Sequence, residues 1–217
     1  MATDAILGPS RPGPQHPGSG TDSGLRQTDC HAGFVLLPAH RERLCRFVGS
    51  IAGAVEKLEG TMSDDLKHLR ETILLAKQSR DTGNHPFGAL LVGPDGAVLL
   101  RSGNTWLADK GVGHAEANVA RAASQSFSAA FLAGCTLYTS VEPCCMCAGA
   151  CYWAGIGTVV YGMTEKRLAV LTGDNPDNLT LDLPCETVFA AGQRRVETRG
   201  PFVEIETEVA AGHADFW

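Results

Sequence analysis

The sequence predicts an α/β fold, in which a sheet carries helices on both of its faces. Two observations support this prediction. From about residue 62 onward, short apolar runs typical of strands alternate with segments of helical periodicity. Within residues 135–161, a strand, a helix and a second strand follow one another at lengths that favour a parallel pair joined by a right-handed crossover. At 217 residues, the chain is long enough for one ordinary domain and an extension.

The first elements of the domain are a helix and a hairpin. We expect Ser63 to cap the helix, which should end near residues 82–83, where a glycine follows a threonine. The apolar runs at residues 88–92 and 97–100 flank Gly93-Pro94-Asp95-Gly96, a sequence typical of a turn between paired strands.

The later elements complete the sheet and cover it. A helix is expected from Glu116 to about Ala123. The sequence then predicts strands at residues 135–140 and 157–161, a short helix at 186–191 and a last strand at 195–198.

The N-terminal quarter of the chain has a different composition. Residues 1–30 are rich in Pro, Gly, Ser and Thr, which predicts disorder. Residues 33–60 contain apolar side chains at helical spacing. We therefore expect residues 1–61 to form a disordered or partly helical extension, and residues 62–217 to form the functional domain.

Composition limits the classes of function. The net charge of −6 argues against a broad nucleic-acid surface and favours a small-molecule substrate. No apolar run approaches the ~20 residues of a membrane span. Four of the eight cysteines lie within residues 144–151, a crowding unlike a disulfide scaffold, so we expect a reducing, cytoplasmic setting.

The segment 141–150 carries the clearest chemical pattern. Pro143 is expected to begin a helix that Glu142 caps. Cys144 and Cys147 are three residues apart and so share one face of that helix. The positive end of the helix dipole favours the thiolate form that binds zinc.

A third protein ligand is expected to be His114. The order His-x-Glu followed by Pro-Cys-x-x-Cys is the general signature of zinc-dependent base deaminases, and this chain matches it. Two cysteines and one histidine leave the fourth position of a tetrahedral zinc open for water, which is typical of a catalytic site. Glu116, two residues after the histidine, is placed to exchange protons with that water.

Together these segments resemble a known family. Asn104, His114-Ala115-Glu116 and residues 142–150 are similar to the cytidine and deoxycytidylate deaminase superfamily. The most similar branch acts on purines and free bases, and includes guanine deaminases, fungal cytosine deaminases and tRNA adenosine deaminases. The resemblance implies a three-layer α/β/α sandwich with a central mixed five-stranded sheet. It also implies an assembly of two or more copies, a homodimer first, that removes an exocyclic amino group by hydrolysis and releases ammonia.

The resemblance also implies roles for individual residues. Zinc would be held by His114, Cys144 and Cys147, and Glu116 would carry protons from the zinc-bound water to a ring nitrogen and then to the leaving amine. The substrate contacts would be the Asn104 side chain, the Ala115 N–H, the Glu142 main-chain carbonyl, Phe87 in the small-residue floor Pro86-Phe87-Gly88-Ala89, and Asp215 in a tail that closes over the base.

The substrate depends on the branch. Phe87 and the pair Tyr152-Trp153 resemble guanine deaminases, and the last ten residues lack the basic cluster that an RNA enzyme would use. Residues 111–113, Gly-Val-Gly, depart from the Asp-Pro-Thr of those relatives. We therefore expect a free nucleobase or nucleoside, guanine first and cytosine next. A tRNA adenosine deaminase and a non-catalytic structural zinc domain are the alternatives.

Several residues have simpler explanations. Asn104 alone is typical of a cap or turn, and Asp215 lies near a chain end where side chains are usually solvated. The remaining cysteines considered, Cys135, Cys145 and Cys151, are expected to pack in the core or the pocket wall. Five histidines show no ligand spacing and stay unassigned: His31, His40, His68, His85 and His213.

Overall fold

The structure is a computed structural model that describes residues 38–217, without the side chains of residues 38–49, 51, 52 and 59. The chain divides into two compact units, residues 1–46 and residues 47–217. Of the first unit, the structure describes residues 38–46, which are helical. The disorder predicted for residues 1–30 lies outside the described residues.

Helix α1 (Pro38–Asp81) begins at a proline, whose fixed φ and missing N–H suit the first turn of a helix. The predicted cap at Ser63 is wrong, because the helix continues through this residue. Gly60 costs the helix only about 1 kcal/mol, and no proline interrupts it. The helix ends at Asp81, beside the predicted end. A domain boundary at residue 62 stays a prediction.

The five strands form one mixed sheet with the order β2-β1-β3-β4-β5. Strand β1 pairs antiparallel with β2 and β3, whereas β3 with β4 and β4 with β5 are parallel. The predicted hairpin and parallel pair are therefore confirmed. The bounds are β1 Gly88–Val92, β2 Val98–Gly103, β3 Thr136–Val141, β4 Thr158–Met163 and β5 Glu197–Arg199.

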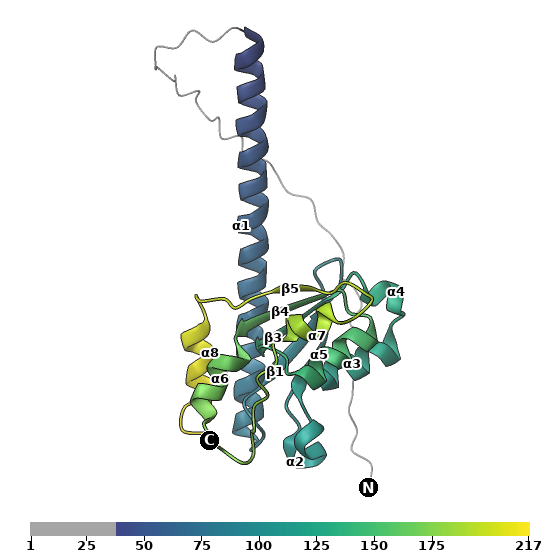
Figure 1. Cartoon of the computed structure of the whole chain (residues 1–217), viewed down its shortest axis with the longest axis vertical. Helices are drawn as coiled ribbons and strands as arrows, with labels where there is room; N and C mark the ends of the chain where they lie inside the picture. Colours follow the sequence, from purple (N-terminus) through teal and green to yellow (C-terminus); the bar gives the residue numbers. More distant parts are fainter. Residues whose placement is uncertain (1–37) are drawn as a thin grey trace, which may run out of the picture. The chain divides into compact units, whose positions relative to one another are not determined.

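Helices cover both faces of the sheet, which confirms the predicted three-layer architecture (Figure 1). One core cluster joins the sheet to α3 (Ala115–Ser126), α5 (Cys145–Ala154) and α7 (Cys185–Ala190). The other joins it to α1, α6 (Glu165–Thr172) and α8 (Glu206–His213). Three short helical segments lie between these elements: α2 Trp106–Asp109, the 3₁₀ turn Lys110–Val112 and α4 Ala129–Leu132. No described helix has the length and apolar character needed to cross a membrane.

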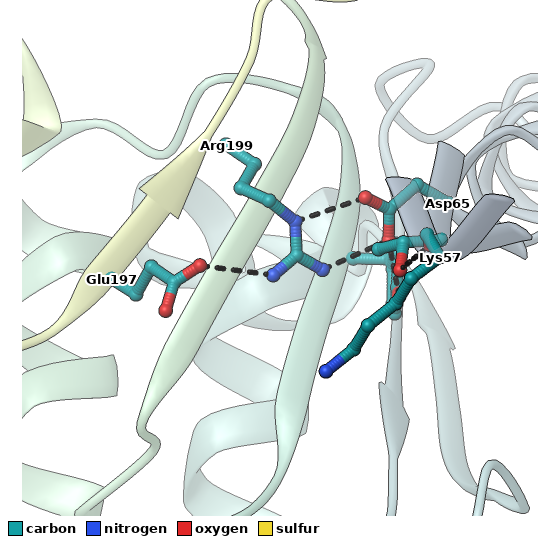
Figure 2. A network of polar contacts seen from close by, with 6 residues as sticks. Lys57, Asp65, Glu197 and Arg199 are labelled. Carbon is teal, nitrogen blue, oxygen red and sulfur yellow. Dashed lines mark hydrogen bonds and ion pairs between the residues drawn. The ribbon is translucent and has the colours of Figure 1, made fainter. Parts of the chain in front are cut away.

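A buried polar network ties α1 to the sheet (Figure 2). Asp65 is 2% exposed and accepts a hydrogen bond of 2.7 Å from the Tyr138 hydroxyl. The guanidinium of Arg199, on β5, donates to both oxygens of the same carboxylate, each at 2.9 Å, and also contacts Glu197 at 3.2 Å. Since both oxygens of Asp65 are paired, the network links the helix to the strands, and removing one partner would leave a buried charge uncompensated.

Strand β1 runs close against α1. A Cβ at Gly88 would collide with the main-chain carbonyl of Thr72 and with the backbone of Ala76. Gly88 is therefore small because a helix backbone lies beside it. The prediction that this small residue lets a flat ring approach has no support in the packing.

Candidate metal and catalytic site

The three predicted metal ligands lie at the starts of two helices. His114 is the N-cap of α3 and Cys144 is the N-cap of α5, both with extended backbone, and Cys147 lies in the first turn of α5. The predicted helix start at Pro143 was therefore two residues too early. Helices α3 and α5 pack side by side on the same face of the sheet, so their N-termini bring the imidazole and the thiols together.

The geometry of these side chains fits zinc. Their ligand atoms all lie within 4.8 Å of one another. The Nδ1 atom of His114 is 3.5 Å from the sulfur of Cys144 and 3.5 Å from that of Cys147. For a tetrahedral ion with Zn–S of about 2.3 Å and Zn–N of about 2.0 Å, the expected N···S separation is about 3.5 Å. Two thiols and one imidazole at this spacing match a zinc site with three protein ligands.

The local environment favours one thiolate, that of Cys144, whereas the hydrogen bond with Cys144, together with burial, raises the pKa of Cys147. The hydrogen bond from Cys147, with a further one from His114, lowers the pKa of the Cys144 thiol. Burial lowers the pKa of His114, but its hydrogen bond with Cys144 and the nearby charge of Glu116 raise it, and the net direction is upward. The two sulfurs and the imidazole thus share protons that a bound cation would displace.

Glu116 lies beside the ligands, in the first turn of α3, and is 4% exposed. One carboxylate oxygen accepts a hydrogen bond of 2.7 Å from the hydroxyl of Thr139, and the other lies 3.6 Å from the sulfur of Cys147. Burial raises the pKa of Glu116, against the lowering effects of His114 and Thr139. A carboxyl group with a raised pKa next to a metal site is suited to proton transfer near neutral pH.

Asn104 is fixed at the end of β2. Its backbone N–H donates to the carbonyl of Phe87 at 3.1 Å, its backbone carbonyl accepts from the Ser79 hydroxyl at 2.8 Å, and its side-chain oxygen accepts from the N–H of Trp106 at 2.8 Å. Its side-chain NH₂ has no hydrogen bond among the described residues. The turn role considered for Asn104 is therefore real, and it leaves the amide donor available for a ligand.

The loop before His114 is also tightly placed. Gly113 lies against Thr105, where an added Cβ would come within 2.9 Å of the threonine backbone. The Thr105 N–H donates to the Gly113 carbonyl at 2.7 Å, and the Asn118 side chain donates to the Thr105 hydroxyl at 3.0 Å. The contacts of Gly113, the last residue of Gly-Val-Gly, with Thr105 thus fix the backbone just before the start of α3. Ala115 follows as the first residue of that helix, where the N–H has no intrahelical partner.

Aromatic side chains flank the site. The ring of Phe87 lies 6.4 Å from that of His114 and nearly parallel to it, and 6.1 Å from that of Trp217. Trp217 also contacts His85, at 5.1 Å between ring centroids. Asp215 is exposed and makes no hydrogen bond or ion pair among the described residues. Two tail residues reach Phe87: His213, at 5.1 Å between ring centroids, and Trp217. A substrate contact for Asp215 stays a prediction without a supporting interaction.

Glu142 acts differently from the predicted cap. Its carboxylate accepts from the N–H of Glu165 at 3.1 Å and from the N–H of Cys185 at 2.9 Å, the first residues of α6 and α7. It therefore caps two helices other than α5. The role expected for its main-chain carbonyl stays a prediction.

Two residues near the site were missed by sequence reasoning. Thr139 is a fully buried hydroxyl residue on β3, and the signal was its polar character at a core-facing strand position. Glu165 is 7% exposed, and one of its oxygens has no hydrogen-bond partner among the described residues. Burial, with the nearby charge of Cys144, raises the pKa of Glu165 to about 8. Glu165 is one acidic residue at the start of α6, and no motif or spacing in the sequence marked it as part of the site.

The other cysteines behave as predicted where they were assigned to the core. Cys135 and Cys151 are fully buried, and burial raises the pKa of both thiols. Cys145 is half-buried next to the ligands. Of the unassigned histidines, His85 packs against Trp106 at 5.2 Å between ring centroids, and His31 lies outside the described residues.

Comparison with known proteins gives the family. Residues 62–163 match the cytidine and deoxycytidylate deaminase zinc-binding region. The chain is 34% identical over 153 residues to a Schizosaccharomyces pombe protein named "Probable cytosine deaminase", a match that covers 70% of this chain and 92% of that protein. It is 39% identical over 103 residues to the guanine deaminase of Bacillus subtilis, which covers 46% of this chain and 66% of that enzyme. A tRNA-specific adenosine deaminase of Bacillus subtilis is 35% identical over 107 residues, covering 49% of this chain and 66% of that enzyme.

Solved structures share the fold. A structure from a study of tRNA:A34 deaminases has a TM-score of 0.52 at 24% identity and covers 68% of this chain and 99% of that chain. A guanine deaminase from Nitrosomonas europaea has a TM-score of 0.52 at 16% identity and covers 69% of this chain and 82% of that chain. At these sequence identities, the structural similarity shows a shared fold and nothing more. With the sequence matches and the His-Cys-Cys geometry, the conclusion is that this chain belongs to the zinc-dependent cytidine and deoxycytidylate deaminase family.

Proposed function

We propose that this chain is a hydrolytic deaminase of a free nucleobase. The observation that carries the proposal is the placement of Glu116. It is a buried carboxyl group with a raised pKa, one oxygen of which lies 3.6 Å from the Cys147 sulfur, beside a ligand set that fits zinc. A zinc site that is purely structural does not require a buried carboxyl group beside its ligands.

The proposed chemistry assigns a task to each side chain. His114, Cys144 and Cys147 hold zinc, which when bound lowers the pKa of a water to ~7. Glu116 takes a proton from the attacking water, delivers it to a ring nitrogen, and passes a proton to the departing amine. The oxygen of water replaces the amino group on the ring carbon, and ammonia leaves.

Substrate positioning falls to the chain around the ligands. The free side-chain NH₂ of Asn104 and the first N–H of α3, from Ala115, are donors for a carbonyl edge of the base. The main-chain carbonyl of Glu142 accepts from the amino group, and the ring of Phe87, parallel to His114, provides an apolar wall. In this proposal Trp217 covers the base, in the position expected earlier for Asp215.

Cytosine and guanine are the first substrates to test. The relative that this chain matches over 92% of its length is named a cytosine deaminase, which supports cytosine. The guanine deaminase match and the Phe87 and Tyr152-Trp153 pattern support guanine. Tail aromatics packed against Phe87 restrict the space beside the site, which favours a free base over a base attached to a polymer.

A tRNA substrate is the second candidate, because relatives named tRNA-specific adenosine deaminases match at 35% and 37% identity. The net charge of −6 counts against it. A chain that binds tRNA through phosphates would lose affinity steeply as salt rises, whereas turnover of a free base would depend only weakly on salt.

We also propose that the chain forms a homodimer through α5. Met146 is 37% exposed and Trp153 is 85% exposed, and the two residues are seven apart, on one face of this helix. An exposed tryptophan in line with a methionine is costly to leave in water. Light scattering should give the mass of two chains for the wild type, and Trp153→Glu should shift it toward one.

The deciding experiment measures ammonia and zinc together. Wild-type protein with about one zinc per chain should release ammonia from free cytosine or guanine. Glu116→Gln should keep its zinc and lose activity, and Cys147→Ala should lose both. Glu186→Gln, at an exposed glutamate whose side chain accepts a hydrogen bond from Thr198, is the matched control and should retain both. Wild-type protein that holds zinc but is inactive on every free base, nucleoside and tRNA would overturn the proposal.

A further inference from the structure

Helix α1 carries an apolar stripe over residues 48–62, before it reaches the sheet. The stripe consists of five residues spaced by alternating steps of three and four: Val48, Ile51, Val55, Leu58 and Met62. Residues at this spacing lie along one face of a helix and occupy the a and d positions of a heptad repeat. Where the structure describes their side chains, these are in contact with water: Val55 is 44% exposed, Leu58 64% and Met62 46%.

The same face of α1 is covered further along the chain. Steps of three and four lead on from Met62 to Asp65 and Leu69, which are 2% and 0% exposed. Leu69 packs in one core cluster with residues of β1 and β4. The sheet thus buries this face from residue 65 onward, whereas the apolar pattern starts well before it. Exposed side chains that continue a buried apolar stripe are typical of a surface that a partner covers.

The charges around the stripe indicate the kind of partner. The outward heptad positions b and c hold the charged residues Glu56, Lys57 and Asp64. The flanking positions e and g hold Ala52, Ala54, Glu59 and Thr61. A membrane surface or a nucleic acid would be matched by basic residues beside the stripe, and these four positions hold none. With one charge among them, two copies of the stripe can meet without a row of like charges at their edges.

The sheet decides how a second copy can lie on the stripe. A parallel partner would run along α1 toward Asp65 and Leu69, where the sheet already covers this face. An antiparallel partner lays its own residues 48–62 on the stripe and has its domain at the other end. Because steps of three and four alternate in either direction, the stripe is complementary to itself in this arrangement, as a contact with two-fold symmetry requires.

We propose that residues 48–62 of α1 bind the same residues of a second copy of this chain, as an antiparallel pair of helices. The contact spans about two heptads, so it is small, and we expect a Kd on the order of 0.1 mM. It lies on the face of the sheet opposite to α5, because α1 and α5 belong to different core clusters. The pairing therefore depends neither on the α5 dimer nor on the deaminase proposal.

The test measures mass against concentration for the zinc-loaded, full-length protein. In sedimentation velocity, the weight-average mass should rise about twofold between about 5 µM and about 500 µM. If α5 forms the dimer proposed above, this rise is from two chains toward four in the wild type and from one toward two in Trp153→Glu. A mass that stays constant up to the highest concentration would overturn the proposal and leave the stripe to another partner or to another segment of the same chain.

Two substitutions that add the same charge separate the stripe from the rest of the helix. Leu58→Glu places a carboxylate on the stripe and should weaken the association at least about tenfold. Ser50→Glu places it at an exposed outward position of the same helix and should leave the Kd unchanged. Since both side chains are exposed, thermal melts at low concentration should show that both variants fold. Association of Leu58→Glu equal to that of the wild type would overturn the proposal.

Cross-linking tests the orientation. With the photoreactive residue p-benzoylphenylalanine in place of Met62, irradiation at high concentration should link two chains, and the antiparallel pair should be attached near residue 48 of the second copy. A parallel pair would be attached near residue 62. Peptide mapping of the linked species distinguishes the two, and attachment near residue 62 would overturn the proposed arrangement.

Discussion

Two adjacent residues of β3 show how differently the two faces of the sheet use a buried carboxylate. Tyr138 points toward α1 and donates to Asp65 at 2.7 Å, and Thr139 points toward α3 and donates to Glu116 at 2.7 Å. The two acids are almost equally buried, at 2% and 4% exposed. The hydrogen bond to the carboxylate thus has the same length on both faces of the sheet, and the two carboxylates are buried to nearly the same depth.

The difference lies in the remaining partners. Arg199 neutralises Asp65 and fills both of its oxygens, so this acid is part of the scaffold. Glu116 has no cationic side chain of Lys or Arg bonded to it among the described residues, and its second oxygen faces a sulfur of the metal site. A buried acid that is fully paired is fixed by its partners and is costly to unpair, whereas one left incompletely paired is available for chemistry.

The largest expected effect that separates the two acids is on catalysis. Glu116→Gln should lower the rate of ammonia release by roughly 10²–10⁴-fold, the contribution typical of general acid–base groups. Its free energy of unfolding at pH 7 should stay level or rise, because the amide avoids the desolvation that raises the pKa of Glu116. Activity assays and thermal melts check this. A variant that is strongly destabilised would show that Glu116 belongs with Asp65 as a structural acid.

The next effect is on stability. Asp65→Asn should lower the free energy of unfolding by about 3–5 kcal/mol, since it leaves the Arg199 charge without its buried counterion. The rate per folded molecule should stay close to wild type. Denaturant titration measures the loss. Glu197→Gln, at the exposed end of the same network, is the control and should change stability by less than about 1 kcal/mol.

A smaller pair of effects comes from the two donors on β3. Tyr138→Phe should lower the free energy of unfolding by about 1–2 kcal/mol and leave the pH–rate profile in place. Thr139→Val should move the acidic limb of that profile to higher pH, because the Thr139 hydrogen bond lowers the pKa of Glu116. The comparison between the faces fails if Tyr138→Phe shifts the profile and Thr139→Val does not.

The smallest effect concerns Glu165, a third buried acid. Its pKa in the folded chain, about 8, lies above its ordinary value of 4.5, so the folded state binds this proton more tightly than the unfolded state. The stability from this group is complete below pH 4.5 and is lost as pH rises through 8. Glu165→Gln should therefore flatten the fall in melting temperature between pH 5 and pH 8. An unchanged slope would show that Glu165 does not titrate in this range.

The two cysteines of the candidate metal site could be predicted from their local spacing, and His114 from the two-part signature that the chain matches. His114 and Cys144 are helix N-caps, and the spacing from Cys144 to Cys147 spans one turn. Strand alternation and turn residues likewise predicted the hairpin and the parallel pair, with errors of up to three residues at the ends. Helical structure was expected within residues 33–60, but its unbroken continuation through residue 62 was missed, because Gly60 and the expected cap at Ser63 are too weak a signal to decide whether a helix stops.

The parts that could not be predicted depend on contacts between distant segments. The packing of Trp217 against Phe87, with Asp215 left exposed, accompanies a turn at Asp215, where φ is +54°. The side chain of Glu142 bonds to residues 23 and 43 positions away, and no periodicity indicates such partners.

The double cap by Glu142 has a consequence for how this chain tolerates change in length. Because one carboxylate holds the first amides of both α6 and α7, the segment between them, residues 173–184, is anchored at two points that do not depend on its own sequence. We expect added or deleted residues there to leave the neighbouring helix starts in register. This connection is therefore the natural place to graft a tag or a recognition peptide while keeping the metal ligands undisturbed.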